Sequence, residues 1–396
     1  MYILICKKFH ETIVLSQQQS MLTKFKETGP PEVDSFFSRP ATEEIFEQLP
    51  SFVKQKIVHS MRRKWGRAVE WNAFPFLHIR LYIVFFQPQP PPAGAFVDIA
   101  RFVQSIFLFF GKNMAHKSGL RRLNFYLFLS DLKKTFPEVP QTPFQIINVN
   151  SGFTFFSTAD PTIKDICIFR KEEWEKVTIH EIIHALNIEF TNASSKQLDI
   201  MMGKYIFKHQ VTATSPPYPP LRLFETYVEL WATILHILFS LGNGGVGGRF
   251  CEKEFERKLQ KEQAWAVIQY MRILQWGGQS SQRKARSSAL TPAQLLTMEK
   301  RFVSIDETNT YAYFLLKARF LLQLPLFFQF TGASIYFEKT IEKLLQFFDC
   351  IVKLYSPPIS HEWAQICGGD ENGMGDVWNH FKIIYPNSLR MTVTSS

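Results

Sequence analysis

Three residues within one short stretch have the types and the spacing that metal-assisted hydrolysis requires. His180 and His184 are four residues apart, so on a helix both imidazoles leave one face and can reach the same metal ion. Glu181, about 100° around the helix from His180, borders the same cavity and can take a proton from water. The competing interpretation is an ordinary amphipathic helix with two surface histidines. A separate apolar stripe favours the metal-binding interpretation, because the helix can pack through this stripe while its flank carries the ligands. The stripe consists of Ile179, Ile182, Ile183 and Leu186.

A third ligand must come from elsewhere in the chain, because a catalytic zinc site normally takes three protein ligands. The later stretch FETYVELWATILH is apolar nearly all round, yet Glu225, Glu229 and His236 fall within about 40° of one another on a helix. Buried carboxylates need partners, which a metal and its histidines would supply. We expect Glu225 to be the ligand and Glu229 to accept a hydrogen bond from a ligand histidine. The reverse assignment stays open here, as does pairing of both carboxylates with lysine or arginine.

The motif and its surroundings resemble one branch of the zincin metallopeptidases. Metzincins do not fit, because Asn187 and Phe190 occupy the positions of that branch's glycine and third histidine. The order of a small sheet, the HEIIH helix and a later helix with ETYVE resembles the gluzincin branch over about residues 123–240. Glu229 stands where gluzincins often carry an aspartate, which leaves its role less defined by the resemblance.

The resemblance implies a function and a cofactor. Zn²⁺ would be held by His180, His184 and Glu225, and Glu181 would act as general base in the hydrolysis of a peptide or protein substrate. No cysteine spacing in the chain offers a competing zinc site.

Substrate contacts are also implied by the resemblance. In zincins the strand before the active-site helix often binds substrate as an added β-strand, which points here to Asn150, Ser151 and Gly152. The alternative is that these residues form only a turn between two strands. A side chain that stabilises the oxyanion is expected too, and the sequence does not choose among the candidates Tyr311, Tyr313, His209 and Tyr218.

The elements that must position these residues predict an α+β fold. We expect a loosely ordered leader at 1–45, a helical region at 46–122, a zincin-like core at 123–240 and a helical region at 241–396. The first region of clear helical spacing runs from about 42 to 69, and a second helix is expected at about 95–112. The expected strands are short, aromatic and β-branched, and turn residues separate them: 123–129, 144–149, 153–156 and 165–170. A helix at 171–188 follows them directly.

Composition limits the other classes of function. The net charge of +10 comes without a nucleic-acid-binding motif, so we expect a solvated basic surface and no specific nucleic acid. The longest apolar run, 230–241, is shorter than the about 20 residues of a transmembrane helix. Five scattered cysteines and the lack of an evident signal peptide predict an intracellular, cytoplasmic protein.

Two other functions compete with the peptidase. One is a zincin fold that no longer turns over and serves as a binding or scaffold protein, although the presence of Glu181 argues against it. The other is a basic nucleic-acid or membrane-surface binder in which the motif is accidental. Metal content separates the basic binder from the peptidase and the scaffold, and peptide hydrolysis separates the peptidase from the scaffold.

Overall fold

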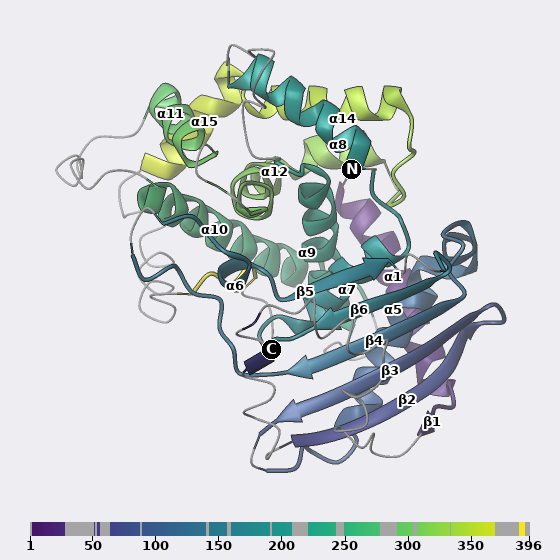
Figure 1. Cartoon of the computed structure of the whole chain (residues 1–396). Helices are drawn as coiled ribbons and strands as arrows, with labels where there is room; N and C mark the ends of the chain where they lie inside the picture. Colours follow the sequence, from purple (N-terminus) through teal and green to yellow (C-terminus); the bar gives the residue numbers. More distant parts are fainter. Residues whose placement is uncertain are drawn as a thin grey trace.

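A mixed sheet and a helical layer that continues into a larger helical body make up the protein (Figure 1). The computed structural model describes residues 2–27, 51, 54–55, 64–87, 89–139, 142–156, 160–190, 192–207, 221–242, 249–277, 291–303, 306, 308–332, 334–368 and 388–392. The α+β class expected from the sequence is consistent with this architecture.

The sheet has six strands in the order β1-β2-β3-β4-β6-β5. Their bounds are β1 Lys26–Glu27, β2 Lys64–Phe74, β3 Leu77–Phe86, β4 Arg122–Leu129, β5 Gly152–Phe156 and β6 Ile163–Ile168. The pairs β3/β4 and β4/β6 are parallel, whereas β1/β2, β2/β3 and β5/β6 are antiparallel. Strand β5 therefore forms one edge of the sheet, directly beside the helix that carries the histidines.

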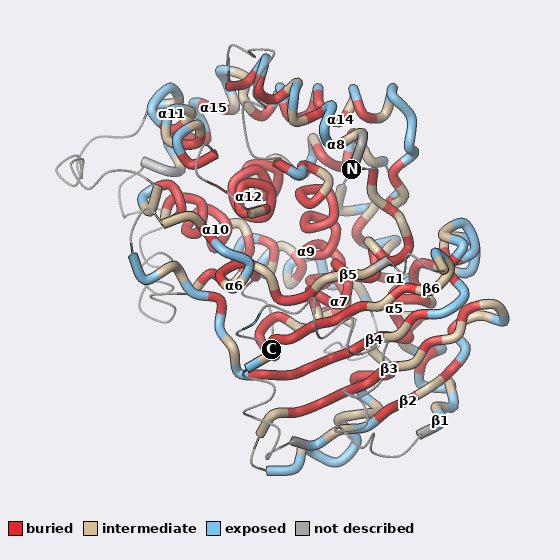
Figure 2. The backbone as a smooth tube through the Cα atoms, in the orientation of Figure 1, coloured by how far each residue is buried: buried red, intermediate tan, exposed pale blue. Residues whose placement is uncertain are grey.

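The central strands are buried on both faces, which explains their continuous apolar sequences (Figure 2). On one face Leu81, Phe125 and Ile166 join the main core under the helices. On the other face Tyr82 and Tyr126 lie on neighbouring strands and stack with their ring centroids 5.1 Å apart.

Helices cover the first of these faces and continue into the helical body. Helices α5 Ala95–Lys117 and α7 Trp174–Ala185 pack against the sheet, and α1 Tyr2–Leu22 packs on α5 (Figure 1). The other helices are α6 Ile146–Val149, α8 Asn192–Met201, η1 Met202–Ile206, α9 Phe224–Gly242, α10 Glu252–Gly277, α11 Pro292–Val303, η3 Tyr311–Leu316, α12 Lys317–Leu322, α13 Leu324–Thr331, α14 Ile341–Leu354 and α15 Pro357–Gly368. Helices η1 and η3 are π-helical turns.

Helix α9 occupies the centre of the molecule. It packs against α1, α7, α10, η3 and α12, and nearly all of its residues are buried, which accounts for a sequence that is apolar nearly all round (Figure 2). None of the helices in the described parts of the chain combines the length and the apolar character needed to cross a membrane.

Several predicted elements agree with the structure. Strands occur at β4, β5 and β6 within a few residues of their expected positions, and helices occur at α5 and α7. From residue 249 onward the described chain is helical apart from connecting loops and the short segment 388–392.

The prediction of a loosely ordered leader is wrong for residues 2–22. They form α1, which packs against α5 and α9 through a buried face that includes Cys6, His10 and Ile13. Polar and apolar residues alternate irregularly along this helix, so its buried face is not evident from the sequence. Residues 28–45 lie outside the described part of the chain.

The prediction of a helical region at 46–122 is wrong for 64–86, where strands β2 and β3 lie, whereas residues 51, 54 and 55 and helix α5 are helical as expected. The helix expected at 42–69 cannot extend beyond 63, since Lys64 pairs with Phe86 across the two strands. The residues that suggested helical spacing before 63 lie outside the described part. The sheet thus begins well before residue 123.

The strand expected at 144–149 is instead the short helix α6. Its first turn is closed by a capping box in which the backbone N–H of Gln145 donates to Asn148 Oδ1 at 2.9 Å. This local exchange of hydrogen bonds outweighs the β-branched character of the Ile146–Val149 stretch.

Candidate metal centre

Helix α7 carries the HEIIH motif, and its two ends are fixed by unusual backbone conformations. Glu173, just before the helix, has φ of 63°, a left-handed conformation that costs a non-glycine residue about 1–3 kcal/mol. Its carboxylate accepts from Lys134 Nζ at 3.0 Å and from the backbone N–H of Thr392 at 2.5 Å, which holds it there. Asn187 adopts φ of 52° after the helix and turns the chain so that Glu189 returns to His184.

The predicted apolar stripe of α7 lies in the core, with Ile179, Ile182 and Ile183 fully buried. The opposite flank therefore faces α9, which α7 contacts directly. This packing brings His180 and His184 against the first two turns of α9, where Glu225 and Glu229 lie.

Three potential ligand atoms converge between the two helices. His180 Nε2 lies 3.1 Å from His184 Nε2 and 3.2 Å from Glu225 Oε2, and His184 Nε2 lies 3.3 Å from the same oxygen. In a tetrahedral zinc site, bonds of about 2.0–2.1 Å place neighbouring ligand atoms about 3.3–3.4 Å apart. The triangle therefore has the size of one face of a zinc coordination tetrahedron, and these three residues could hold such an ion.

The other ring nitrogen of each histidine is occupied by a carboxylate. His180 Nδ1 donates to Glu229 Oε2 at 3.1 Å, and His184 Nδ1 donates to Glu189 Oε1 at 2.9 Å. Protons on both Nδ1 atoms leave the Nε2 lone pairs directed into the triangle, which is the tautomer that ligates metal. Two such nitrogens and a carboxylate oxygen repel one another unless a cation or a shared proton lies between them.

Glu225 is ionised at this position. Burial by itself would raise the pKa of its carboxyl. When the Nε2 atoms carry protons instead of a metal, as the raised pKa values of both histidines favour, the charge on His184 and the hydrogen bonds from both imidazoles outweigh the burial and lower the pKa of Glu225 to about 2. Its second oxygen, Oε1, accepts from Asn309 Nδ2 at 3.1 Å. Asn309 thus fixes the rotation of the carboxylate and turns Oε2 towards the histidines.

Glu181 lies beside the triangle and not within it. Its Oε2 accepts from Thr154 Oγ1 at 2.8 Å, and burial raises the pKa of its carboxyl. Thr154 belongs to the edge strand β5, so the same strand that borders the site also orients this carboxylate. A carboxylate with a raised pKa is better matched to accepting and releasing a proton near neutrality.

Glu229 pairs with lysine, as one interpretation of the sequence predicts, and it also accepts a hydrogen bond from His180. Its Oε1 accepts from Lys176 and, at 3.0 Å, from Lys317, and all three side chains are buried. Burial raises the pKa of the Glu229 carboxyl, but the two ammonium groups outweigh it and keep the pKa well below its usual range. The charged carboxylate then attracts the Nδ1 proton of His180.

The residues expected to contact substrate line one small cavity beside the motif. Asn150, Ser151 and Gly152 border it together with His180 and Glu181. Gly152 begins β5, and the chain before it forms the end of α6, so these residues connect a helix with an edge strand and not two strands. A β-carbon at Gly152 would lie 2.9 Å from Val177 Cγ1, which explains the glycine there.

Among the candidate oxyanion donors, Tyr313 lies at the site. It lines the same cavity, its hydroxyl accepts from Asn309 Nδ2 at 3.1 Å, and burial keeps its pKa well above the usual range. Tyr311 instead bonds to Tyr355 at 2.7 Å, away from the histidines. His209 and Tyr218 lie outside the described residues. His236, grouped with the carboxylates in the sequence, contacts Glu175 at 3.3 Å.

Five contributors were not assigned from the sequence: Thr154, Lys176, Glu189, Asn309 and Lys317. Lys176 precedes His180 by four residues, so helical spacing could have placed it on the same face. Lys317 and Arg319 interrupt the apolar run YAYFLLKARFLL, and charges within such a run signal buried ion pairs. Nothing local in the sequence links Glu189 or Asn309 to the motif.

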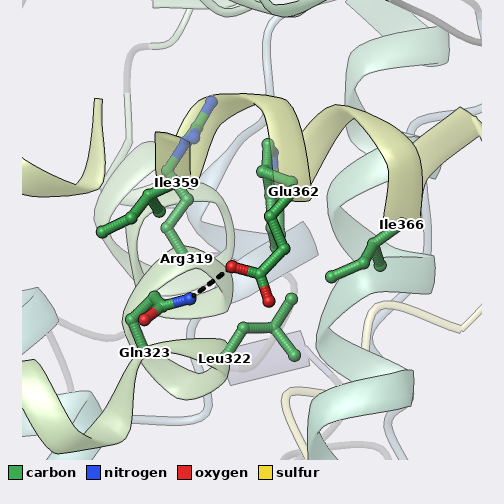
Figure 3. A pocket seen from close by; sticks show the side chains of 7 residues that line it. Arg319, Leu322, Gln323, Ile359, Glu362 and Ile366 are labelled. Carbon is green, nitrogen blue, oxygen red and sulfur yellow. Dashed lines mark hydrogen bonds between the residues drawn. The ribbon is translucent and has the colours of Figure 1, made fainter. Parts of the chain in front are cut away.

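Two further cavities offer less chemistry. One of about 10 Å³ lies between α12 and α15, where Gln323 Nε2 donates to Glu362 Oε2 at 3.2 Å and Arg319 is among the lining residues (Figure 3). It has room for about one water molecule. The other, of about 240 Å³, lies between α1, α5 and residues 334–335, and Lys8 is the only charged side chain in its lining.

Comparisons of the chain with protein-family models, with curated proteins and with solved structures found no match.

Proposed function

We propose that this protein is a zinc-dependent peptidase in which His180, His184 and Glu225 hold the metal. The proposal is supported above all by the triangle of His180 Nε2, His184 Nε2 and Glu225 Oε2, whose sides are 3.1–3.3 Å. The Nδ1 atoms of both histidines already donate to carboxylates outside this triangle. When bound, zinc supplies a Lewis acid that polarises a carbonyl and acidifies water.

Glu181 is the general base. Thr154 holds Oε2, so Oε1 is the oxygen that accepts the proton of the attacking water and later delivers it to the leaving amine. Burial supports this role, because it disfavours the charged form of the carboxyl and raises its pKa, which favours acceptance of the proton from the attacking water.

A peptide has a place to lie beside these groups. Within the described chain β5 pairs only with β6, so its outer edge presents backbone N–H and C=O groups that an extended peptide can pair with. Tyr313 remains protonated and can donate to the oxyanion that forms on the scissile carbonyl.

The experiment is metal analysis of the purified chain, followed by cleavage of a mixed peptide library. We expect about one zinc per chain and cleavage that chelation abolishes and zinc restores. Absence of stoichiometric metal after zinc is supplied contradicts the metal site. Zinc without cleavage of any peptide indicates the competing function, a metal-containing zincin fold that acts as a scaffold.

A further inference from the structure

A small cavity adjoins the candidate base and one of the candidate ligands. It has a volume of about 10 Å³ and is bounded by the turn at Asn150–Gly152, by α7 and α9, and by Met391. A cavity of this size accommodates about one water molecule, and a methyl or hydroxymethyl group is of similar size. Ser151 contributes a buried hydroxyl that has no hydrogen-bond partner among the described residues.

The position of the cavity connects it with a bound peptide. His180 and Glu181 both line it, so a group seated there lies next to the bond that the site would break. Its other side is the start of β5, the edge along which a peptide would pair. Because successive side chains of an extended peptide alternate between two faces, an edge-paired peptide can direct one side chain beside the scissile bond towards this cavity.

Met391 closes the cavity from a part of the chain far from the motif. It belongs to the segment 388–392, which lies beside α10 and is drawn in yellow in Figure 1. Leu389, Met391 and Thr392 in this segment are all buried.

Hydrogen bonds, two of them from the buried side chains of Trp265 and Gln269, hold the segment on both sides. Trp265 Nε1 donates to the Arg390 carbonyl at 2.8 Å, and Gln269 Nε2 donates to the Ser388 carbonyl at 2.9 Å. The Leu389 N–H donates to the Lys134 carbonyl at 2.9 Å. Because several hydrogen bonds must break before the segment can leave, Met391 is a fixed wall.

Met391 is also connected by hydrogen bonds to the candidate metal centre. Lys317 Nζ donates to the Met391 carbonyl at 2.7 Å and to Glu229 Oε1 at 3.0 Å. Glu173, which precedes the helix that carries the histidines, accepts from the Thr392 N–H. The position of Met391 relative to His180 is therefore set through two buried charged groups.

We propose that the segment 388–392, through Met391, restricts the substrate residue beside the scissile bond to glycine, alanine or serine. This inference rests on the proposed peptidase function. A larger side chain would overlap with Met391 or Val177, both of which are buried, and overpacking of a tight site typically costs enough to reduce binding about tenfold or more. The unpartnered Ser151 hydroxyl makes serine acceptable.

The experiment compares a set of peptides that differ only at the residue beside the scissile bond. The zinc-loaded protein should cleave the glycine, alanine and serine peptides with kcat/KM about tenfold or more above the leucine and phenylalanine peptides. Met391→Ala removes the thioether beyond Cβ and should reduce this ratio about tenfold by admitting leucine. Leu389→Ala is the matched control, because it truncates a buried residue of the same segment that does not line the cavity. The control should keep the preference of the parent.

Binding gives a readout that does not depend on turnover. The same peptides are titrated against Glu181→Gln protein with and without Met391→Ala. Tighter binding of the peptides with small residues supports the inference if Met391→Ala removes this preference. It does so even if the parent protein cleaves no peptide, since the lack of cleavage would overturn only the proposed peptidase function. Equal cleavage and binding of small and large residues by the parent overturns the inference, as does a Met391→Ala profile identical to that of the parent. A change in the Leu389→Ala control of the same size as in Met391→Ala would also overturn it, since general loosening of the segment would then explain both.

Discussion

Two buried polar clusters in this molecule differ in whether their charges are balanced. In the helical body, Arg319 pairs with Glu299 Oε1 at 2.8 Å, and its guanidinium lies 4.3 Å from the Tyr355 ring centroid and 5.1 Å from that of Trp363. The hydroxyls of Tyr270 and Tyr355 donate to Glu299 at 2.5 and 2.8 Å. One cation and one anion thus neutralise each other within a set of aromatic and hydroxyl partners.

The cluster between α7 and α9 is unbalanced at its centre. Two imidazole Nε2 atoms and one carboxylate oxygen face each other at 3.1–3.3 Å, while their outer atoms are all engaged. Balance there requires a cation from outside the chain or a proton. Burial and charge alone therefore do not distinguish the two clusters, whereas the convergence of ligand atoms with satisfied outer atoms makes only the second a candidate metal site.

The largest expected effect tests whether the Arg319 cluster is structural. Arg319→Met leaves Glu299 buried without its counter-charge, so the free energy of unfolding should fall by about 3–5 kcal/mol. Urea unfolding followed by circular dichroism measures the loss. The folded fraction should still bind one zinc, and a drop in zinc stoichiometry would show that the two clusters are not separate.

The next effect concerns the two carboxylates of α9. Glu225→Ala removes a metal ligand and should weaken zinc binding more than Glu229→Ala, which removes only the acceptor of the His180 proton and should cost about 10–100-fold. Competition with a zinc chelator measures both affinities. Glu229→Ala also leaves Lys176 and Lys317 without their carboxylate, so affinity must be measured on folded protein. Equal or reversed losses would move the ligand assignment to Glu229.

A smaller effect separates metal binding from catalysis. Glu181→Gln keeps the shape of the side chain and all three ligands but removes the base, so hydrolysis should fall by about 100-fold or more with zinc affinity nearly unchanged. Peptide cleavage and metal content are measured on the same preparation. Full activity would mean that another group activates the water, and loss of zinc would contradict the separation of Glu181 from the triangle.

The smallest effect sharpens the role of the outer carboxylates. Glu189→Gln keeps a hydrogen-bond acceptor for His184 Nδ1 but removes its charge, so zinc affinity should fall by about tenfold. Glu338→Gln, a change of the same type elsewhere in the chain, serves as the control. An affinity equal to that of the parent would show that Glu189 orients the imidazole by shape and not by charge.

Part of this centre was determined by the sequence alone. The four-residue spacing of His180 and His184 on a helix, and the shared face of Glu225 and Glu229, follow from helical periodicity, which is a local property. The helix α7 was predictable for the same reason. The strands β4, β5 and β6 were predictable from short runs of aromatic and β-branched residues between turn residues, which are also a local property. Zinc binding and peptide hydrolysis remain predictions that rest on this pattern and on the geometry that it produces.

The rest depended on pairing between residues far apart in the chain and, at 144–149, on a side-chain cap. The pairing of Lys64 with Phe86 placed β2 in the sheet, although the preceding residues had suggested a continuous helix. The β-branched residues within 144–149 predict a strand, yet the exchange of hydrogen bonds between Gln145 and Asn148 makes Ile146–Val149 helical. In each case a non-local pairing or a side-chain cap outweighed propensity, which is worth only a fraction of a kcal/mol per residue.

What only the tertiary structure decided is the division of roles among the polar groups. Helical spacing places Glu225 and Glu229 on one face of α9. The packing of α7 on α9 brings Glu225 Oε2 against the Nε2 atoms of both histidines. It brings Glu229 against two lysines and the Nδ1 atom of His180. Asn309 and Met391 reach the site from the helical body and from the segment 388–392, at sequence separations that no periodicity spans. The physical reason is that a sequence specifies which side chains share an element face, whereas the close packing of different elements fixes which atoms of those side chains meet.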